Sequence, residues 1–315
     1  MQLYRDDGIV LRTQKLGEAD RIITILGRNS GRIRAVAKGV RRTKSRFGAR
    51  LEPFTHVDLM LHVGRSLDVI TQAEVIRPYG EQLIGDYPRY TAGVAMLETA
   101  ERFTPVEKEP SLRELLLLIG GLRTLGDGEH EPGLVLDAFL LRSLAVAGYA
   151  PALQECARCG APGVSAPAAG ARGASAPAAS PRGVAAPETN ANNAPANASD
   201  APANASDAPA PEPNGALTPA RGAPASSSRP RAGAVRLPAF AMAAGGMVCA
   251  SCRPPGAASP AASTVSLMLA LLRGDWDGAD ASERRHRVEC SGLVAAYLQW
   301  HLEHSIRSLR HVERV

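Results

Sequence analysis

The stretch that decides the fold reads RIITILGRNSGRIRAVAK and spans residues 21–38. Two apolar runs flank the segment Gly27–Gly31, whose composition is typical of a tight turn. In the second run Ile33, Ala35 and Ala37 alternate with other residues, so this strand has one face toward a core and one toward solvent. The stretch therefore predicts an antiparallel hairpin with one buried face.

Three further strands are predicted around this hairpin, over residues 8–15, 55–63 and 67–74. The strand over 55–63 alternates, with an inward and an outward set of side chains: Val57, Leu59, Leu61 and Val63 inside, His56, Asp58, Met60 and His62 outside. In the first strand, Ile9, Leu11 and Thr13 share one face. Five short strands with one buried face predict a small closed barrel of the oligonucleotide-binding (OB) type. An SH3-like barrel fits the same pattern.

From Pro78 onward the apolar period becomes helical. Helices are predicted over 88–103 and 111–125, and from Pro132 to about Ala147, where Gly148 and Pro151 end the pattern. Near the C-terminus one amphipathic helix is predicted over 288–309, because its apolar residues recur at helical spacing: Val294, Leu298, Leu302, Ile306 and Leu309. The barrel is thus followed by a helical domain.

The segment 161–235 differs in composition from the rest of the chain. It contains 26 alanines and 13 prolines among 75 residues and no aromatic side chain. Such a segment buries too little apolar surface to offset the entropy of ordering it, so we expect it to be a disordered insertion. An inert spacer is the simpler interpretation, and a tethered interaction tail is the alternative.

Composition and charge exclude several classes of protein. No apolar stretch is long enough to span a bilayer, and residues 1–7 carry charges in place of a signal sequence, so we expect a cytoplasmic protein with reduced cysteines. Residues 1–80 carry 15 Lys and Arg against 8 Asp and Glu, a net charge of +7, so the remainder sums to −2. A basic N-terminal module indicates a polyanionic partner.

Four of the five cysteines form two Cys-x-x-Cys pairs, Cys156 with Cys159 and Cys249 with Cys252. Zinc prefers four thiolates in tetrahedral geometry, and one turn can present both sulfurs of such a pair. Between the pairs lie 89 residues, and subtracting the 75-residue insertion leaves 14, a spacing typical of zinc sites. The sequence therefore predicts one structural zinc, with four metal-free thiols as the alternative. Cys290 is expected to be a core thiol.

Residues 28–50 contain nine basic residues and no acidic one. We expect eight of them to contact DNA: Arg32, Arg34, Lys38, Arg41, Arg42, Lys44, Arg46 and Arg50. Such a stripe neutralises phosphates, which gives salt-dependent affinity without reading base sequence. No phosphate-binding loop, hydrolase motif or paired carboxylates accompany it, so we expect no enzymatic activity.

Several motifs together resemble the bacterial RecO family of recombination mediators. They are YRDDGIVL at 4–11, GEADR at 17–21, AKGVRR at 37–42, LEPF at 51–54, GYAP at 148–151 and AGG at 244–246. The resemblance covers about 240 residues, everything except the insertion, which is the departure from the family pattern. It implies an α+β multidomain protein, with an OB barrel at 1–80, helical parts at 81–155 and 254–315, and a four-cysteine zinc module at 156–253 interrupted by the insertion.

The resemblance also implies partners. Such proteins bind single- and double-stranded DNA, anneal complementary strands, engage the acidic tail of single-strand-binding protein (SSB) and, with RecR, help load RecA. The motif match marks Lys38, Arg41 and Arg42 as DNA contacts. Arg142, on an otherwise apolar helix, is the candidate contact for the tail, with a structural salt bridge as the alternative. Rival hypotheses are a zinc-ribbon transcriptional regulator that binds specific duplex DNA and a scaffold that binds an acidic protein.

Overall fold

The computed structural model describes residues 2–43, 45, 47–164, 234–302 and 306–312. Residues 1–167 and 231–315 belong to one compact unit. The disorder expected for the insertion falls almost wholly on 165–233 and so lies outside the described residues, as do Lys44 and Arg46.

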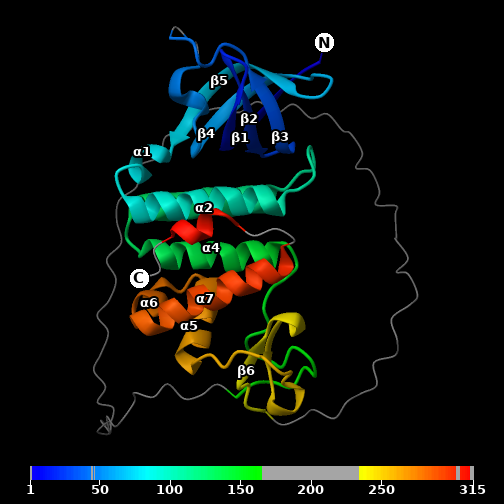
Figure 1. The fold of residues 1–315 in the computed structure, drawn as a ribbon, viewed down its shortest axis with the longest axis vertical. Coiled ribbons are helices and arrows are strands. Elements are labelled where there is room, and N and C mark those ends of the chain that lie inside the picture. The colour runs from blue at the N-terminus through cyan, green and yellow to red at the C-terminus, as the bar shows by residue number, and fades with distance from the viewer. Residues whose placement is uncertain (1, 44, 46, 165–233, 303–305, 313–315) are drawn as a thin grey trace, which may run out of the picture. The chain divides into compact units, whose positions relative to one another are not determined.

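Five strands form a closed barrel (Figure 1). They are β1 (Leu3–Leu16), β2 (Asp20–Gly27), β3 (Gly31–Ala37), β4 (Thr55–His62) and β5 (Asp68–Pro78). Their order is β1-β2-β3-β5-β4, with β4 returning to β1 and with β3 parallel to β5. This topology is that of the five-stranded OB barrel, so the first of the two predicted barrel types is confirmed.

The buried faces follow the predicted alternation, with two corrections. Ile33, Ala35 and Ala37 of β3 lie in the barrel core, as do three of the four residues expected inside β4. The prediction that Val63 faces the core is wrong, because this residue lies beyond the end of β4 and is 37% exposed. The prediction that His56 faces solvent is also wrong. This residue is buried, and its Nε2 lies 3.0 Å from the Asp7 carboxylate.

Strand β1 contributes side chains to two hydrophobic cores, that of the barrel and that of the helices. Val10 lies in the barrel core, whereas Ile9 and Leu11 share the opposite face, as predicted, and pack into the helical core. A break in register between Val10 and Arg12 accompanies this change. The barrel and the helices are therefore joined through an apolar contact.

The helical part contains α1 (Gly80–Leu83), α2 (Tyr87–Phe103), α3 (Leu112–Asp127), α4 (Pro132–Val146), α5 (Ala262–Arg273), α6 (Trp276–Asp280) and α7 (Arg284–His301). The Asp86 side chain caps α2 by accepting from the Arg89 backbone N–H, and Gly128 ends α3 in the left-handed conformation. Ten of the fifteen residues of α4 are buried, because this helix packs against α2, α3, α5 and α7 (Figure 1). The predicted helices over 88–103, 111–125 and 132–147 are confirmed within two residues.

The single helix predicted over 288–309 is wrong. Helix α7 begins earlier, at Arg284, and ends at His301, where Leu302 turns to extended backbone. Ser308 starts a separate 3-10 turn, in which its hydroxyl and backbone N–H both donate to the Glu98 carboxylate of α2, at 2.6 and 2.8 Å. Ile306 and Leu309 are still buried, but from this separate segment rather than from α7.

A strap between α2 and α3, residues 104–110, ties the helices to the barrel. Lys108 donates its backbone N–H to Arg32 of β3 over 2.9 Å, and its ammonium lies 3.0 Å from the buried carboxylate of Asp68. The strap thereby pairs with the part of β3 that precedes its short parallel contact with β5. Gly31 is required here, because a Cβ on it would lie 1.7 Å from the carbonyl oxygen of Glu109.

Candidate metal centre and nucleic-acid interface

The cysteine pairs lie on two tight turns of a small module beside the helices. Gly160, with a φ of +69°, follows the first pair and donates its N–H to the Cys156 carbonyl over 2.8 Å. The second pair follows the hairpin of β6 (Ala239–Ala241) and β7 (Gly246–Val248) and forms a 3-10 turn. Each turn therefore points two sulfurs toward the other turn.

The four cysteine Sγ atoms all lie within 4.8 Å of one another. In a tetrahedral site with Zn–S bonds of about 2.3 Å, the sulfur–sulfur distance is about 3.8 Å. The Sγ atoms of Cys159 and Cys249 are 3.9 Å apart, close to that value. The cluster thus has the donor set and nearly the dimensions that a bound zinc requires.

The pKa values of these thiols also indicate that a bound cation is needed to keep all four ionised. Burial opposes ionisation of Cys156, but backbone N–H groups directed at its sulfur, among them that of Cys249 at 3.4 Å, lower its pKa to about 6. Hydrogen bonding to Cys249 and the nearby sulfurs raise the pKa of Cys252 to about 12. The backbone therefore stabilises one thiolate, whereas four thiolates at this spacing need a metal ion to hold them together.

The module also closes around the ends of the predicted insertion. Val164 donates its backbone N–H to Val235 over 2.9 Å, and Val235 donates to Pro162 over 2.8 Å. Ala161 is buried and accepts from the N–H of Cys156. Residues 161–164 and 234–235 thus belong to the cysteine module. The predicted insertion of 161–235 is therefore too long at both ends.

The segment 38–54 between β3 and β4, which we name the basic loop, is held by apolar anchors. Val40, Phe47 and Leu51 are buried in the barrel core. Next to these anchors lie basic side chains that are exposed to solvent: Lys38, Arg41, Arg42 and Arg50. The anchors fix the backbone of the loop, so its cations are presented on a defined surface.

Two motifs that are separate in the sequence meet at this loop. Asp20 accepts the backbone N–H of Gly39 over 2.7 Å. Arg41 donates its backbone N–H to Ala19 over 2.9 Å and its guanidinium to the Glu18 carbonyl over 2.8 Å. Asp20 therefore positions the loop, a role that its place in the motif at 17–21 does not reveal.

Arg32 and Arg34 occupy a different environment from the other predicted DNA contacts. The Arg32 guanidinium donates to the Pro105 carbonyl, and that of Arg34 lies 3.4 Å from the Glu107 carboxylate. Both are therefore turned toward the strap rather than toward the basic loop. The structure thus divides the predicted stripe into two groups along β3.

Arg142 caps a helix within the helical part. Its Nε and Nη2 donate to the Leu271 carbonyl near the end of α5, at 3.0 and 2.7 Å, and its guanidinium lies 6.0 Å from the centre of the Trp276 ring. Burial lowers its pKa. Among the described residues Arg142 forms no salt bridge; it caps one carbonyl near the end of α5 instead.

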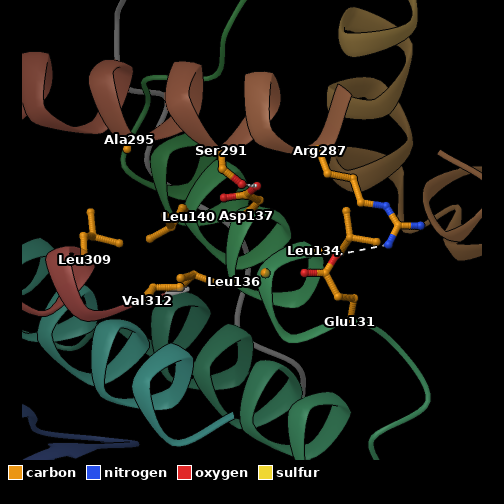
Figure 2. A pocket seen from close by; sticks show the side chains of 11 residues that line it. Glu131, Leu134, Leu136, Asp137, Leu140, Arg287, Ser291, Ala295, Leu309 and Val312 are labelled. Atoms are coloured by element: carbon orange, nitrogen blue, oxygen red, sulfur yellow. Dashed lines mark hydrogen bonds and ion pairs between the residues drawn. The ribbon is translucent and has the colours of Figure 1, made fainter. Parts of the chain in front are cut away.

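A small cavity lies between α4 and α7 (Figure 2). Arg287 pairs with Glu131 at 3.1 Å, and the Ser291 hydroxyl donates to Asp137 over 2.5 Å. Its volume of about 20 Å³ suits a single water molecule. The cavity is therefore part of the packing between the two helices rather than a ligand site.

An OB barrel joined to a helical bundle and a four-cysteine module defines the chain as an α+β protein of the OB-fold class. The family profile described as "Recombination protein O N terminal" matches residues 1–79, and "Recombination protein O C terminal" matches 84–211 and 222–310. The chain belongs to the RecO family, and its role is that of a recombination mediator in DNA repair.

Similar proteins include the DNA repair protein RecO of Thermobifida fusca, 54% identical over 314 residues, and that of Streptomyces griseus subsp. griseus, 50% identical over 320. The DNA repair protein RecO of Frankia casuarinae is 48% identical over 314 residues. Each comparison covers 100% of both chains. The regulator hypothesis is not favoured.

Within the described residues, no helix is both long and apolar enough to cross a membrane.

Proposed function

We propose that the chain binds single- and double-stranded DNA through the basic loop and anneals complementary strands without enzymatic activity. The observation that carries this proposal is the set of exposed cations on an apolar-anchored loop, Lys38, Arg41 and Arg42 above all. Lys44, Arg46 and Arg50 follow in the same loop, and Arg32 and Arg34 continue along β3. All eight are the proposed DNA contacts.

The mechanism is electrostatic. Cations on the loop neutralise phosphates on two strands and release their counterions, so the strands repel each other less and their bases can pair. Because these contacts are to phosphates, binding carries little base preference and weakens steeply as the salt concentration rises. Such a surface can bind DNA of any sequence, as a recombination mediator must, whereas a regulator needs a surface that recognises one sequence.

We propose that Cys156, Cys159, Cys249 and Cys252 hold one structural zinc ion. With four protein ligands the ion has no open coordination position, so it would crosslink the two turns and supply no reactive water. Substituting Cys159 by Ala should therefore release the metal from purified protein, as measured by inductively coupled plasma mass spectrometry. Cys290→Ala is the matched control, because Cys290 is buried in the helical core and should leave the metal content unchanged.

The proposed protein partners are the acidic tail of SSB, RecR and, indirectly, RecA. Arg142 remains the proposed tail contact, although capping α5 already engages two of its donors. Because its DNA would be chromosomal, we place the protein in the cytoplasm, at the nucleoid. We also propose that the chain is divided into a barrel at 1–80, helical parts at 81–155 and 254–315, and a zinc module at 156–253.

The test is annealing of complementary strands pre-coated with SSB, with and without the chain, across a salt series. The wild type should accelerate annealing at low salt and lose the effect as salt rises. The double variant Lys38→Glu/Arg42→Glu should lose most of it, whereas Arg113→Glu/Arg123→Glu, an equal charge change on exposed positions of α3, should not. Equal loss in both would contradict the proposed surface, and binding of one duplex sequence only would favour a regulator. If the chain neither bound DNA nor changed the annealing rate, the hypothesis of a scaffold that binds an acidic protein would be favoured.

A further inference from the structure

An open groove of about 960 Å³ lies between the barrel and the helices. Its walls come from β1, from Pro53 and Phe54 at the end of the basic loop, from α2, and from Leu302 and Arg307. Small-molecule sites have volumes of up to about 1,000 Å³, so this groove can take a group the size of a nucleotide.

Cations outnumber acids on the walls of the groove. Arg12, Arg32, Arg102 and Arg307 line it, against Glu98 and Glu101. Glu101 pairs with Arg12 at 2.9 Å, and Glu98 lies 3.9 Å from Arg102. Arg307 donates its backbone N–H to Glu98 over 2.9 Å, but among the described residues the guanidinium groups of Arg32 and Arg307 have no carboxylate partner, so the groove retains positive charge suited to an anion.

Two buried nitrogens on the wall of the groove lack a hydrogen-bond partner within the described part of the chain. They are Nε of Arg32 and Nε2 of His301. Buried polar groups in native proteins nearly always have a partner in the protein or in ordered water, so these two nitrogens are free to take an acceptor that enters the groove. For Arg32 Nε that acceptor is an oxygen atom, such as one of a phosphate.

An aromatic ring stands at the same wall. Tyr90 of α2 is 41% exposed, and its ring packs edge-to-face on Phe54 with the centroids 5.7 Å apart. Phe54 is buried and holds a left-handed backbone with a φ of +70°, so the ring beneath Tyr90 is fixed in place. A half-exposed aromatic ring on a rigid support is the kind of surface on which a base stacks.

The groove also continues the proposed DNA surface. Arg32 and Lys38 are six residues apart along and just beyond β3, a separation of about 20 Å. At about 3.4 Å per stacked nucleotide this corresponds to roughly six nucleotides, within the site size known for single OB folds. This continuity with the barrel favours a nucleic-acid strand over an acidic peptide as the occupant.

We propose that the groove between β1 and α2 binds the end of a single DNA strand whose remainder lies on the basic loop, with phosphate on Arg32 and Arg307 and a base on Tyr90. The inference rests on the proposed function and extends it, because it adds a stacking site to a surface otherwise made of phosphate contacts. It accounts for the arrangement of Arg32, which is turned away from the loop.

The test places the photocrosslinker p-benzoylphenylalanine at Tyr90 or, as control, at Tyr87 of the full chain, with fluorescent (dT)12 as probe. Tyr87 is exposed on the same helix but does not line the groove. The oligonucleotide should crosslink at position 90 and hardly at 87. In anisotropy titrations Tyr90→Ala should weaken binding about tenfold and Tyr87→Ala should not. Arg307→Glu should weaken it more than Arg113→Glu.

The outcomes separate this inference from the proposed function. If Lys38→Glu/Arg42→Glu weakens (dT)12 binding but position 90 gives no crosslink, the groove inference fails and the proposed function stands. If (dT)12 does not bind, or binds independently of the basic loop, the proposed function fails and the inference fails with it. Crosslinking at position 90 to a peptide of alternating Glu and Leu, undiminished by excess (dT)12, would overturn the inference in favour of a protein ligand.

Discussion

Val164 donates its backbone N–H to the carbonyl oxygen of Val235 over 2.9 Å, across 71 positions of sequence. The chain therefore leaves the cysteine module and returns to it at one place. Together with the bond from the Ala157 N–H to the Met247 carbonyl, at 2.8 Å, this contact holds the two cysteine pairs close whatever the length of the segment between them. Because closing a longer loop costs only about 0.6 kcal/mol for each doubling of its length, a segment of this size is compatible with a closed metal centre.

The first prediction concerns that segment. Replacing residues 165–233 by a four-residue Gly-Ser linker should leave metal content and strand annealing unchanged and should raise the thermal midpoint slightly, because a shorter loop is easier to close. Differential scanning calorimetry and metal analysis measure this, with a 69-residue Gly-Ser replacement as the length-matched control. Loss of annealing in both variants would show that the sequence of the segment has a role of its own.

The second prediction separates positioning of the basic loop from its charge. Asp20→Ala raises the net charge by one, so electrostatics alone predicts tighter DNA binding. Since Asp20 accepts the N–H of Gly39 over 2.7 Å, we expect instead a several-fold weaker affinity as the loop loses its fixed position. Fluorescence anisotropy with a labelled oligonucleotide decides between the two.

Asp20→Asn is the matched control, because it makes the same charge change and keeps an oxygen acceptor for Gly39. Its affinity should equal or exceed that of the wild type. Equal weakening by Ala and Asn would show that the carboxylate charge, rather than the hydrogen bond, holds the loop.

Much of this arrangement could be predicted from the sequence, and the exceptions share a physical cause. The alternation in β3 and β4 predicted the barrel, and the corrected spacing of the cysteine pairs predicted their proximity. The end of α7 could not be predicted, because it depends on Glu98, a residue remote in sequence, capping Ser308. The pairing of Arg34 with Glu107 could not be predicted either, because periodicity within a strand carries no information on a partner 73 residues away.

The third prediction concerns a buried acid in the helical core. Glu114 of α3 is buried, accepts a hydrogen bond from Ser143 over 2.9 Å, and burial raises its pKa from the usual value near 4.5 to about 7. The folded protein therefore binds a proton that the unfolded chain releases between about pH 4.5 and 7. Stability should fall as pH rises through this range, by up to about 3 kcal/mol.

Glu114→Gln keeps the size of the side chain and removes the ionisation. The variant should be more stable than the wild type above pH 7 and should show a flatter stability profile between pH 4.5 and 7. Urea unfolding at several pH values measures both, with Glu109→Gln, an exposed position, as control. A profile unchanged by Glu114→Gln would mean that the carboxyl group ionises freely in the folded state.

The last prediction concerns the strap that holds Arg34. The Glu107 carboxylate lies 3.4 Å from this guanidinium, and both side chains are more than one-third exposed, so the pair contributes little to stability and a phosphate can compete for the arginine. Glu107→Gln should therefore tighten DNA binding about two- to fivefold at low salt without changing the thermal midpoint. In an Arg34→Ala background the same substitution should have much less effect, and this double-mutant cycle isolates the coupling between the two residues. An equal gain in both backgrounds would attribute the effect to net charge alone and would show that Glu107 does not compete with phosphate for Arg34.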